Sequence, residues 1–329
     1  GFAEAYAPVP FTSVKAAATS PDGSLLLVGS GGISRYDGRA FRTLTRSADA
    51  ELVHAFVGPD RTVSLDVQGR LRDEREDGRP FIGTPRWNPA LQDVREVHGS
   101  DFAHALTLVT ETLYRLAPTV TKVEGIPEHI ETFDGDARGF VAFETGGTIH
   151  HHDGTSTRTS RLDGAPPDAL FHRAPNAAFA VGSDHRVSRW DGSTWTTMLT
   201  RPGERLSLVT GNARLLFVQG HDLATDAQVV HRFDGRAWTH VTFAPDDPIT
   251  SLHMVGDVLH AVSDGALLAF DGTKFVRVLE RHDGAILAIH AHSARSVFAI
   301  AMTERYFTSL ERTSTVLHYD GDRWRTIHS

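Results

Sequence analysis

The feature of this chain that most constrains its fold is a short phrase, an Asp-Gly pair between aromatic or apolar residues, that recurs along its length. It is written as RYDGRAF, RWDGSTW, RFDGRAW, AFDGTKF and HYDGDRW, among others. Such a pair predicts a β-hairpin, because glycine accepts the positive φ that a tight two-residue turn requires. The Asp-Gly pairs that fit this repeat begin at residues 37, 77, 153, 191, 234, 271 and 320.

The spacing of these pairs, about 40 residues, is typical of four-stranded propeller blades. One gap is twice as long, and YRLAPTVTKV in its middle is an eighth copy that lacks Asp-Gly. The chain is therefore predicted to be one all-β domain, residues 1–329, folded as an eight-bladed β-propeller of four-stranded antiparallel blades. A seven-bladed propeller is the alternative, if the third copy forms no blade of its own. The predicted repeats span residues 11–45, 51–85, 93–127, 129–162, 165–200, 205–243, 248–280 and 285–329.

An aromatic residue follows the Asp-Gly glycine by three positions in most repeats. This spacing places the ring on the outgoing strand of the hairpin, where it can cover the apolar face of a blade. A side chain that recurs in every blade normally serves packing, so these residues are predicted to belong to the core. They are Phe41, Phe81, Trp195, Trp238, Phe275 and Trp324.

The composition excludes several classes of function. The chain has no cysteine, which excludes disulfides, thiolate metal sites and cysteine nucleophiles and fits an exported protein better than a cytosolic one. Its formal net charge is -8 with no basic block, so no nucleic-acid partner is expected. No apolar run reaches the ~18 residues of a membrane helix, so no membrane insertion is expected. The 19 histidines make the chain rich in groups that titrate near neutral pH.

The stretches SRYDGRAF and SRWDGSTW resemble the Asp-box repeat of sialidase-like propellers. The whole repeat is also similar to the "VG..G.i.r.dG..W" propeller repeats of predicted myxobacterial proteins, and this likeness covers nearly the entire chain. This sequence differs from the Asp-box pattern, since its Asp directly precedes Gly and only Ser34 and Ser188 supply the leading serine. The resemblance implies a bacterial repeat propeller and raises glycan binding as an alternative function.

The sequence has no sialidase-type arginine motif, glycine-rich phosphate loop, GxSxG or HExxH, so no catalytic residue and no cofactor are predicted.

Alignment of the first predicted strand across the repeats produces a column rich in histidine. The strand nearest the propeller axis carries this column, so its members could line a channel, and a hydrolase or lyase that uses the histidines is a further alternative. The favoured interpretation is packing, in which imidazoles replace aromatic wedges and bond the backbone of a neighbouring blade. The column contains Lys15, His54, His98, Asp134, His172, Thr210, His253 and His290.

Two His-x-His pairs, His150 with His152 and His290 with His292, place both imidazoles on one strand face, as metal ligands require. The predicted blades of the two pairs stand opposite each other, so one ion could not bind both. Each pair lacks identifiable further ligands, so no metal site is predicted and the four residues stay weak candidates.

With the four strands of a blade lettered a to d in chain order, three long segments are predicted to lie on one face of the propeller, the face of the b–c turns and of the links between blades. They are residues 84–93, 220–229 and 303–315. Function often lies on loops that project from a rigid scaffold, and these loops carry residue types that are enriched in binding hot spots. The chain is therefore predicted to be a monomeric, non-catalytic recognition or scaffold module that binds a protein or peptide there. The predicted contact residues are Arg86, Trp87, Arg305, Tyr306, Phe307 and Arg312.

Overall fold

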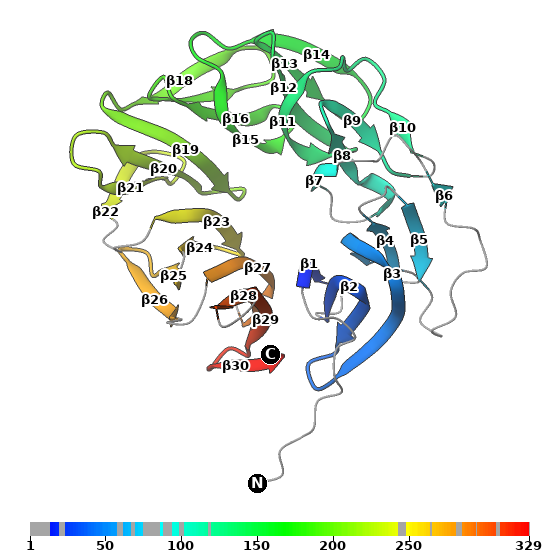
Figure 1. The fold of residues 1–329 in the computed structure, drawn as a ribbon. Helices are drawn as coiled ribbons and strands as arrows, with labels where there is room; N and C mark the ends of the chain where they lie inside the picture. Colours follow the sequence, from blue (N-terminus) through cyan, green and yellow to red (C-terminus); the bar gives the residue numbers. More distant parts are fainter. Residues whose placement is uncertain are drawn as a thin grey trace. The chain divides into compact units, whose positions relative to one another are not determined.

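The structure is a computed structural model (Figure 1). It describes residues 14–19, 24–57, 62–66, 70–74, 86–87, 94–98, 102–117, 120–242, 248–263, 265–280, 285–293, 295–306 and 310–328. Apart from a short 3-10 helix, Phe102–His104, every regular element among these residues is a β-strand. No described helix is long and apolar enough to cross a membrane.

The chain divides into two compact units, which are described separately. The first unit comprises Gly1–Val94, Val262–Leu267 and Val278–Ser329. It contains one six-stranded sheet, in the order β1 (Val14–Thr19), β2 (Leu25–Tyr36), β3 (Phe41–Val57), β4 (Thr62–Asp66), β5 (Arg70–Glu74) and β6 (Arg86–Trp87). It also contains a four-stranded sheet of β27 (Ala285–Ser293), β28 (Ser296–Tyr306), β29 (Leu310–Tyr319) and β30 (Trp324–His328).

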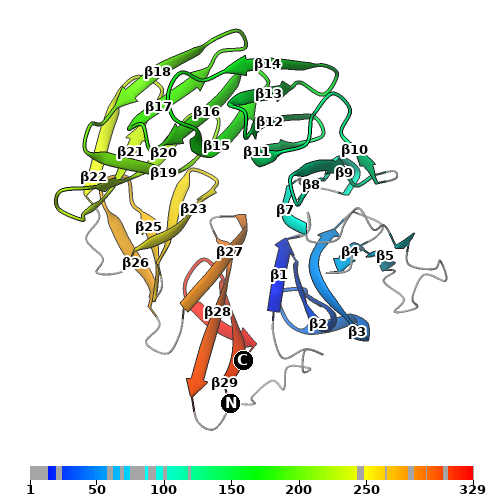
Figure 2. The same ribbon diagram turned by 45° about the horizontal axis from the view of Figure 1, so that its top comes forward.

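The second unit comprises Arg95–Ala261 and Leu268–Arg277. Its first four-stranded sheet consists of β7 (Val94–His98), β8 (Leu106–Val109), β9 (Thr112–Arg115) and β10 (Thr121–Lys122), and its second of β11 (Ile130–Asp136), β12 (Gly139–Glu144), β13 (Thr148–His152) and β14 (Thr157–Arg161). The third sheet consists of β15 (Pro167–Ala174), β16 (Ala177–Gly182), β17 (Arg186–Trp190) and β18 (Trp195–Thr200). The fourth consists of β19 (Glu204–Gly211), β20 (Leu216–Asp222), β21 (Gln228–Phe233) and β22 (Trp238–Thr242). A further sheet, with residues in both units, is β23 (Ile249–Val255), β24 (Val258–Ser263), β25 (Ala266–Phe270) and β26 (Phe275–Glu280). Figure 2 shows the sheets β11–β14, β15–β18 and β19–β22 side by side, as does Figure 1.

The described strands form seven sheets, so the prediction of eight blades is wrong and the seven-bladed alternative matches. The third repeat is not the cause, because β7–β10 is a sheet of its own. Instead, the first two repeats share the six-stranded sheet. Strand β3 runs through both of them, since residues 41–46 pair with β2 and residues 52–57 pair with β4.

The second strand of each sheet forms the centre of the core. Strands β12, β16 and β20 are almost continuous apolar runs, GFVAFE, AAFAVG and LFVQG, and nearly all of their residues are buried. Continuous rather than alternating apolar residues are typical of a strand that is covered on both faces. The largest fully buried side chains come mainly from these strands and from β28: Phe140, Phe143, Phe179, Phe217 and Phe298.

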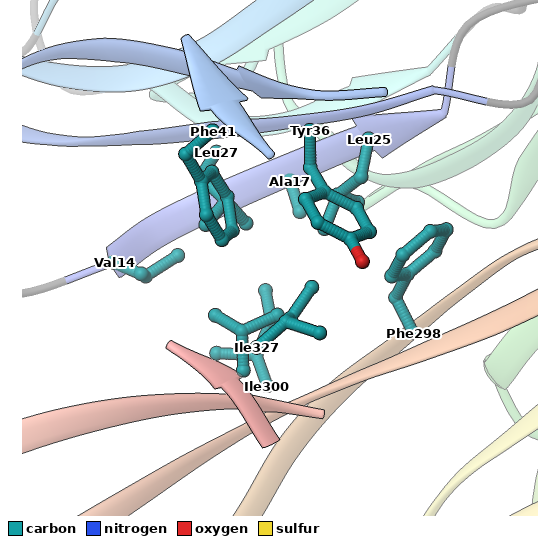
Figure 3. Close-up of a cluster of buried hydrophobic side chains, with 10 residues drawn as sticks. Val14, Ala17, Leu25, Leu27, Tyr36, Phe41, Phe298, Ile300 and Ile327 are labelled. Atoms are coloured by element: carbon teal, nitrogen blue, oxygen red, sulfur yellow. The ribbon is translucent and has the colours of Figure 1, made fainter. Parts of the chain in front are cut away.

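Within the first unit, the first and last sheets of the sequence pack directly on each other (Figure 3). Tyr36 and Phe41 of the first sheet share one buried cluster with Phe298, Ile300 and Ile327 of the last. The Tyr36 and Phe298 rings meet edge to face at 6.2 Å. The two ends of the described chain are therefore neighbours.

The Asp-Gly hairpins are wider than the predicted two-residue turns. Four residues separate the paired Tyr36 and Phe41. Gly38 has a φ of +96°, as the sequence predicts, and the carboxylate of Asp37 accepts hydrogen bonds from the backbone N–H groups of Arg39 and Ala40, at 2.8 and 2.9 Å. The same arrangement recurs at Asp153, Asp191, Asp234, Asp271 and Asp320. The Asp77 copy lies outside the described residues.

In five of the described hairpins, the aromatic residue after the turn pairs with a second aromatic just before it. These two residues face each other across the hairpin, and their ring centroids lie between 4.9 and 5.8 Å apart. Phe41 is buried, as predicted, whereas Trp195, Trp238, Phe275 and Trp324 are only half-buried because they lie on outer strands. Phe81 lies outside the described residues. The pairs are Tyr36/Phe41, Trp190/Trp195, Phe233/Trp238, Phe270/Phe275 and Tyr319/Trp324.

Candidate functional site

A cavity of about 480 Å³ opens in the second unit where three neighbouring sheets meet. It lies at the end of β7 and at the turns that join β11 to β12 and β15 to β16, so it is called here the turn pocket. These are a–b turns, at the opposite ends of the strands from the b–c turns of the predicted binding face. The pocket is lined by His98, Asp134, Gly135, Asp136, Arg138, Gly139, His172, Arg173, Ala174 and Pro175.

Asp134 connects the three sheets. Its Oδ2 accepts a hydrogen bond of 2.6 Å from the backbone N–H of His172 on β15, 38 residues along the chain. Its Oδ1 lies 3.3 Å from Nδ1 of His98 on β7. The three residues belong to the column that the sequence predicts. In this contact a carboxylate, rather than an imidazole, bonds the backbone of the neighbouring sheet.

The imidazole of His172 is packed tightly into one wall of the pocket. A Cβ atom on Gly139 would lie 3.0 Å from Cε1 of His172, so a larger residue at position 139 would press on the ring. The His172 Nε2 is buried and has no hydrogen-bond partner among the described residues. Burial lowers the pKa of His172, against the opposing effect of Asp134 and Asp136. The ring is therefore neutral at pH 7.

Two arginines supply the positive charge of the turn pocket. The Nη2 of Arg173 donates to the carbonyl of Leu215 at 2.8 Å, and its guanidinium lies over the Phe179 ring, 4.7 Å from the centroid. Burial lowers the pKa of Arg173, but an arginine stays charged in proteins. Arg138 pairs with Asp136, with 3.0 Å between Nε and Oδ2. Although burial acts in the opposite direction, these hydrogen bonds lower the pKa of Asp136.

The structure brings together three members of the predicted column, His98, Asp134 and His172, and distributes the others. In the first unit, Lys15 lies on β1, His54 on β3 and His290 on β27, and the side chain of Lys15 is outside the description. In the second unit, Thr210 lies on β19 and His253 on β23. His253 contacts Ser251 Oγ at 2.9 Å, and burial lowers its pKa.

Sequence reasoning missed Asp136, Arg138 and Arg173, which complete the pocket. The signal was present, because Arg173 directly follows His172, and Asp136 and Arg138 lie two and four residues after Asp134, where the first strand of each sheet ends.

The His-x-His pair of β13 is engaged within its own sheet. His150 Nε2 contacts Glu144 Oε2 at 3.0 Å, whereas His152 stacks on Phe140 and contacts Thr157 Oγ1 at 3.2 Å. Among the described residues there is no group of three or more potential metal ligands. In the second pair, the side chain of His292 lies outside the description.

The residues of the predicted partner-binding face are only partly described. Arg86 and Trp87 form β6, where they pair with Leu71 and Arg70. The predicted 303–315 loop is largely a hairpin, because β28 and β29 extend into it and pair Arg305 with Glu311. Tyr306 ends β28 and Arg312 lies on β29, but none of these side chains is described, and Phe307 lies outside the described residues.

The 220–229 segment is an ordered turn between β20 and β21. Asp222 accepts the N–H groups of Ala224 and Thr225, and the backbone of Leu223 bonds Gly203 at 2.8 Å. The Leu223 side chain is 59% exposed.

Comparison with known proteins identifies the fold. No model of a known protein family and no curated protein matches the sequence. Among solved structures, the computationally designed Ika8 protein is similar, with a TM-score of 0.66 at 13% identity over 94% of this chain and 97% of that one. The WD40 beta propeller domain of Doa1 has a TM-score of 0.51 at 8% identity over 88% and 90% of the two chains. YCF48 bound to D1 peptide has 0.50 at 12% identity over 96% and 94%. At these identities the likeness shows the fold alone, and it confirms the predicted β-propeller.

Proposed function

We propose that this chain is a recognition module that binds a protein or peptide segment in the turn pocket. The observation that carries the proposal is the pocket itself, where charged groups from three sheets converge and are held by contacts between sheets. Groups that are already fixed lose little conformational entropy on binding, which favours affinity. The propeller fold supports the same class of function, since one similar structure is a peptide complex.

The charges of the turn pocket indicate what kind of segment it binds. Asp136 is neutralised by Arg138, and Asp134 is occupied by His98 and the His172 backbone. Arg173 is different, because its side-chain contacts are a carbonyl oxygen and two aromatic rings, Phe179 and Phe171. A stacked guanidinium with this environment binds a carboxylate well. The ligand is therefore an extended polar segment with an acidic group against Arg173.

The lining also favours binding over covalent catalysis. Its ten described residues include no serine, threonine, cysteine, lysine or tyrosine. His98 and His172 thus have no hydroxyl or thiol beside them in the pocket to activate as a nucleophile.

The test is selection of peptides from a random phage-displayed library on the immobilised full chain. Selected peptides are expected to be enriched in Asp and Glu, and to lose at least about tenfold in affinity on Arg173→Gln. Arg138→Ala, which alters an exposed side chain of the same pocket, should also weaken binding. Arg236→Ala removes an exposed arginine of the same unit that lines neither cavity and is the matched control. Peptides that bind all four proteins equally would refute the proposal.

The predicted face with Arg86, Trp87 and the 303–315 hairpin stays a prediction, and it needs its own variant. Replacing residues 304–312 by Asn-Gly would shorten the β28–β29 hairpin while keeping a turn that suits it. If this variant, rather than Arg173→Gln, abolishes binding of the selected peptides, the partner binds the predicted loop face.

A further inference from the structure

A second cavity, of about 370 Å³, lies on the outer strands of two neighbouring sheets of the second unit. It is separate from the turn pocket, shares no lining residue with it, and is called here the outer pocket. Six of its twelve lining residues carry hydroxyl groups, so its wall is mainly polar although two tryptophans contribute to it. The lining comprises Thr159, Ser160, Arg161, Leu162, Asp163, Arg186, Ser188, Trp190, Ser193, Thr194, Trp195 and Thr197.

The repeat shows that this polar wall is not required for packing. At the aromatic position after the hairpin, β14 carries Thr157. Three residues later it carries Ser160, where five other repeats have an apolar residue that is buried or packs on the core: Leu44, Met198, Val241, Val278 and Ile327. A position that is apolar in five repeats and polar in β14 points to a role for that strand outside the core.

Ser160 holds the aromatic wall of the outer pocket in place. Its Oγ accepts a hydrogen bond of 2.9 Å from Nε1 of Trp195, because an indole N–H can only donate. The same Oγ lies 2.8 Å from Nε2 of His151, whose ring stacks on Trp190 at 4.0 Å. Trp195 is half-buried, so part of its indole is available to a ligand while its orientation is fixed.

Among the charged side chains of the polar wall, one is held by hydrogen bonds within the protein and two are available to a ligand. Arg186 is fixed, since Nε donates to Asp184 at 2.9 Å and Nη2 donates to the Asp163 carbonyl at 2.7 Å. The side chains of Arg161 and Asp163 are exposed and form no hydrogen bond or ion pair with the described residues. The Arg161 guanidinium can donate several hydrogen bonds, and the Asp163 carboxylate can only accept them.

We propose that the outer pocket binds a saccharide, with the apolar face of one sugar ring against Trp195 and its hydroxyl groups bonded to Arg161 and Asp163. Sugar hydroxyls both donate and accept, and a carboxylate and a guanidinium match them together with the Ser and Thr hydroxyls. An aromatic body with polar groups around it is the complement of a sugar ring, which is apolar on its faces and polar at its rim. Asp163 repels a phosphate group whereas Arg161 attracts it, so inorganic phosphate is the competing probe. The proposal is independent of peptide binding in the turn pocket.

The experiment uses the full chain with ¹⁵N-labelled indoles, titrated separately with glucose, galactose, N-acetylglucosamine and glucuronic acid. The indole N–H resonance of Trp195, assigned by Trp195→Phe, is expected to shift with at least one sugar. Arg161→Ala and Asp163→Asn should each lower the affinity for that sugar by about tenfold, and both change exposed side chains outside the core. Arg236→Ala is the control and should bind as the unmodified chain does.

Three outcomes would overturn this proposal. In the first, no sugar shifts the Trp195 resonance. In the second, the two pocket variants bind the sugar as well as the control does. In the third, inorganic phosphate, titrated as a competing probe, shifts Trp195 where the sugars do not.

Discussion

The neighbouring sheets β11–β14 and β15–β18 have the same strand order but differ at their outer edge. Their second strands are almost identical in character, with Phe140 and Phe143 in one and Phe179 in the other fully buried. At the hairpin, β15–β18 carries the aromatic pair Trp190 and Trp195, whereas β11–β14 carries His152 and Thr157. The two sheets thus share the same apolar second strand, whereas the outer hairpin of β11–β14 lacks the aromatic pair that packs in β15–β18.

This difference teaches how to separate packing from function in a repeat protein. A residue type found in every sheet is explained by the core that each sheet must build. The departures in β13 and β14, namely His152, Thr157 and Ser160, have no such explanation. Of these, Ser160 lines the outer pocket, and it contacts His151, whose ring stacks on Trp190 of the same wall.

The largest expected difference between the two sheets is at the hairpin pair. Trp190→Ala should lower the free energy of unfolding by about 3–5 kcal/mol, because Trp190 is buried and its removal leaves a cavity against His151 and Trp195. The corresponding His152→Ala should cost about 1 kcal/mol or less, since His152 is only half-buried. Urea denaturation followed by circular dichroism measures both values. Equal decreases in the free energy of unfolding would show that the hairpin residues of the two sheets pack equally well, contrary to the difference described above.

The next effect is the pH dependence of stability that His151 of β13 contributes. Burial, with the nearby His172 and His150, lowers the pKa of His151 from 6.5 to about 4, whereas β17 has Arg189 at this position. The unfolded chain then binds the proton more readily, so stability is full above pH 6.5 and falls as the pH drops from 6.5 to about 4. The expected slope is up to about 1.4 kcal/mol per pH unit from this group.

The pH effect is measured by urea midpoints at several pH values, for the unmodified chain and for His151→Gln. The variant should show a shallower loss between pH 6.5 and 4, even if it is less stable at pH 7. An unchanged slope would mean that burial does not lower the pKa of His151.

A smaller effect is expected from restoring the apolar residue at position 160. Ser160→Val should destabilise the chain by about 1–2 kcal/mol, because Trp195 Nε1 and His151 Nε2 both lose their partner. Ser160→Thr keeps the hydroxyl and should restore most of the loss. If Ser160→Val proves stabilising, the outer strand of β11–β14 is a defective copy of the repeat rather than a specialised one.

The smallest effect should be the same in both sheets. Asp153→Ala and Asp191→Ala each remove a carboxylate that accepts two backbone N–H groups of the hairpin turn. These hydrogen bonds lower the pKa of Asp191 to about 2 and that of Asp153 further still, so their stabilisation is present above pH 4 and is lost in stronger acid. Small and equal decreases in melting temperature are expected. Unequal decreases would show that the two hairpins differ as well as the outer strands.

The sequence by itself determined the local features of this protein. Each four-stranded repeat, the positive φ of Gly38 and its equivalents, and the apolar second strands follow from patterns within about 40 residues. The absence of an aromatic at Thr157 and of an apolar residue at Ser160 was also visible in the sequence, and Ser160 lines the outer pocket. Such features depend on φ preferences and on alternation of burial, which neighbouring residues control.

Only the tertiary structure decided how repeats join and which side chains meet. The merging of the first two repeats through β3 depends on whether the backbone stays extended between two hairpins, which no single repeat specifies. The turn pocket likewise requires Asp134 to reach the backbone of His172 in the next sheet. Register and spacing between separately formed sheets govern these contacts, and the periodic pattern is the same whichever neighbouring side chains come together.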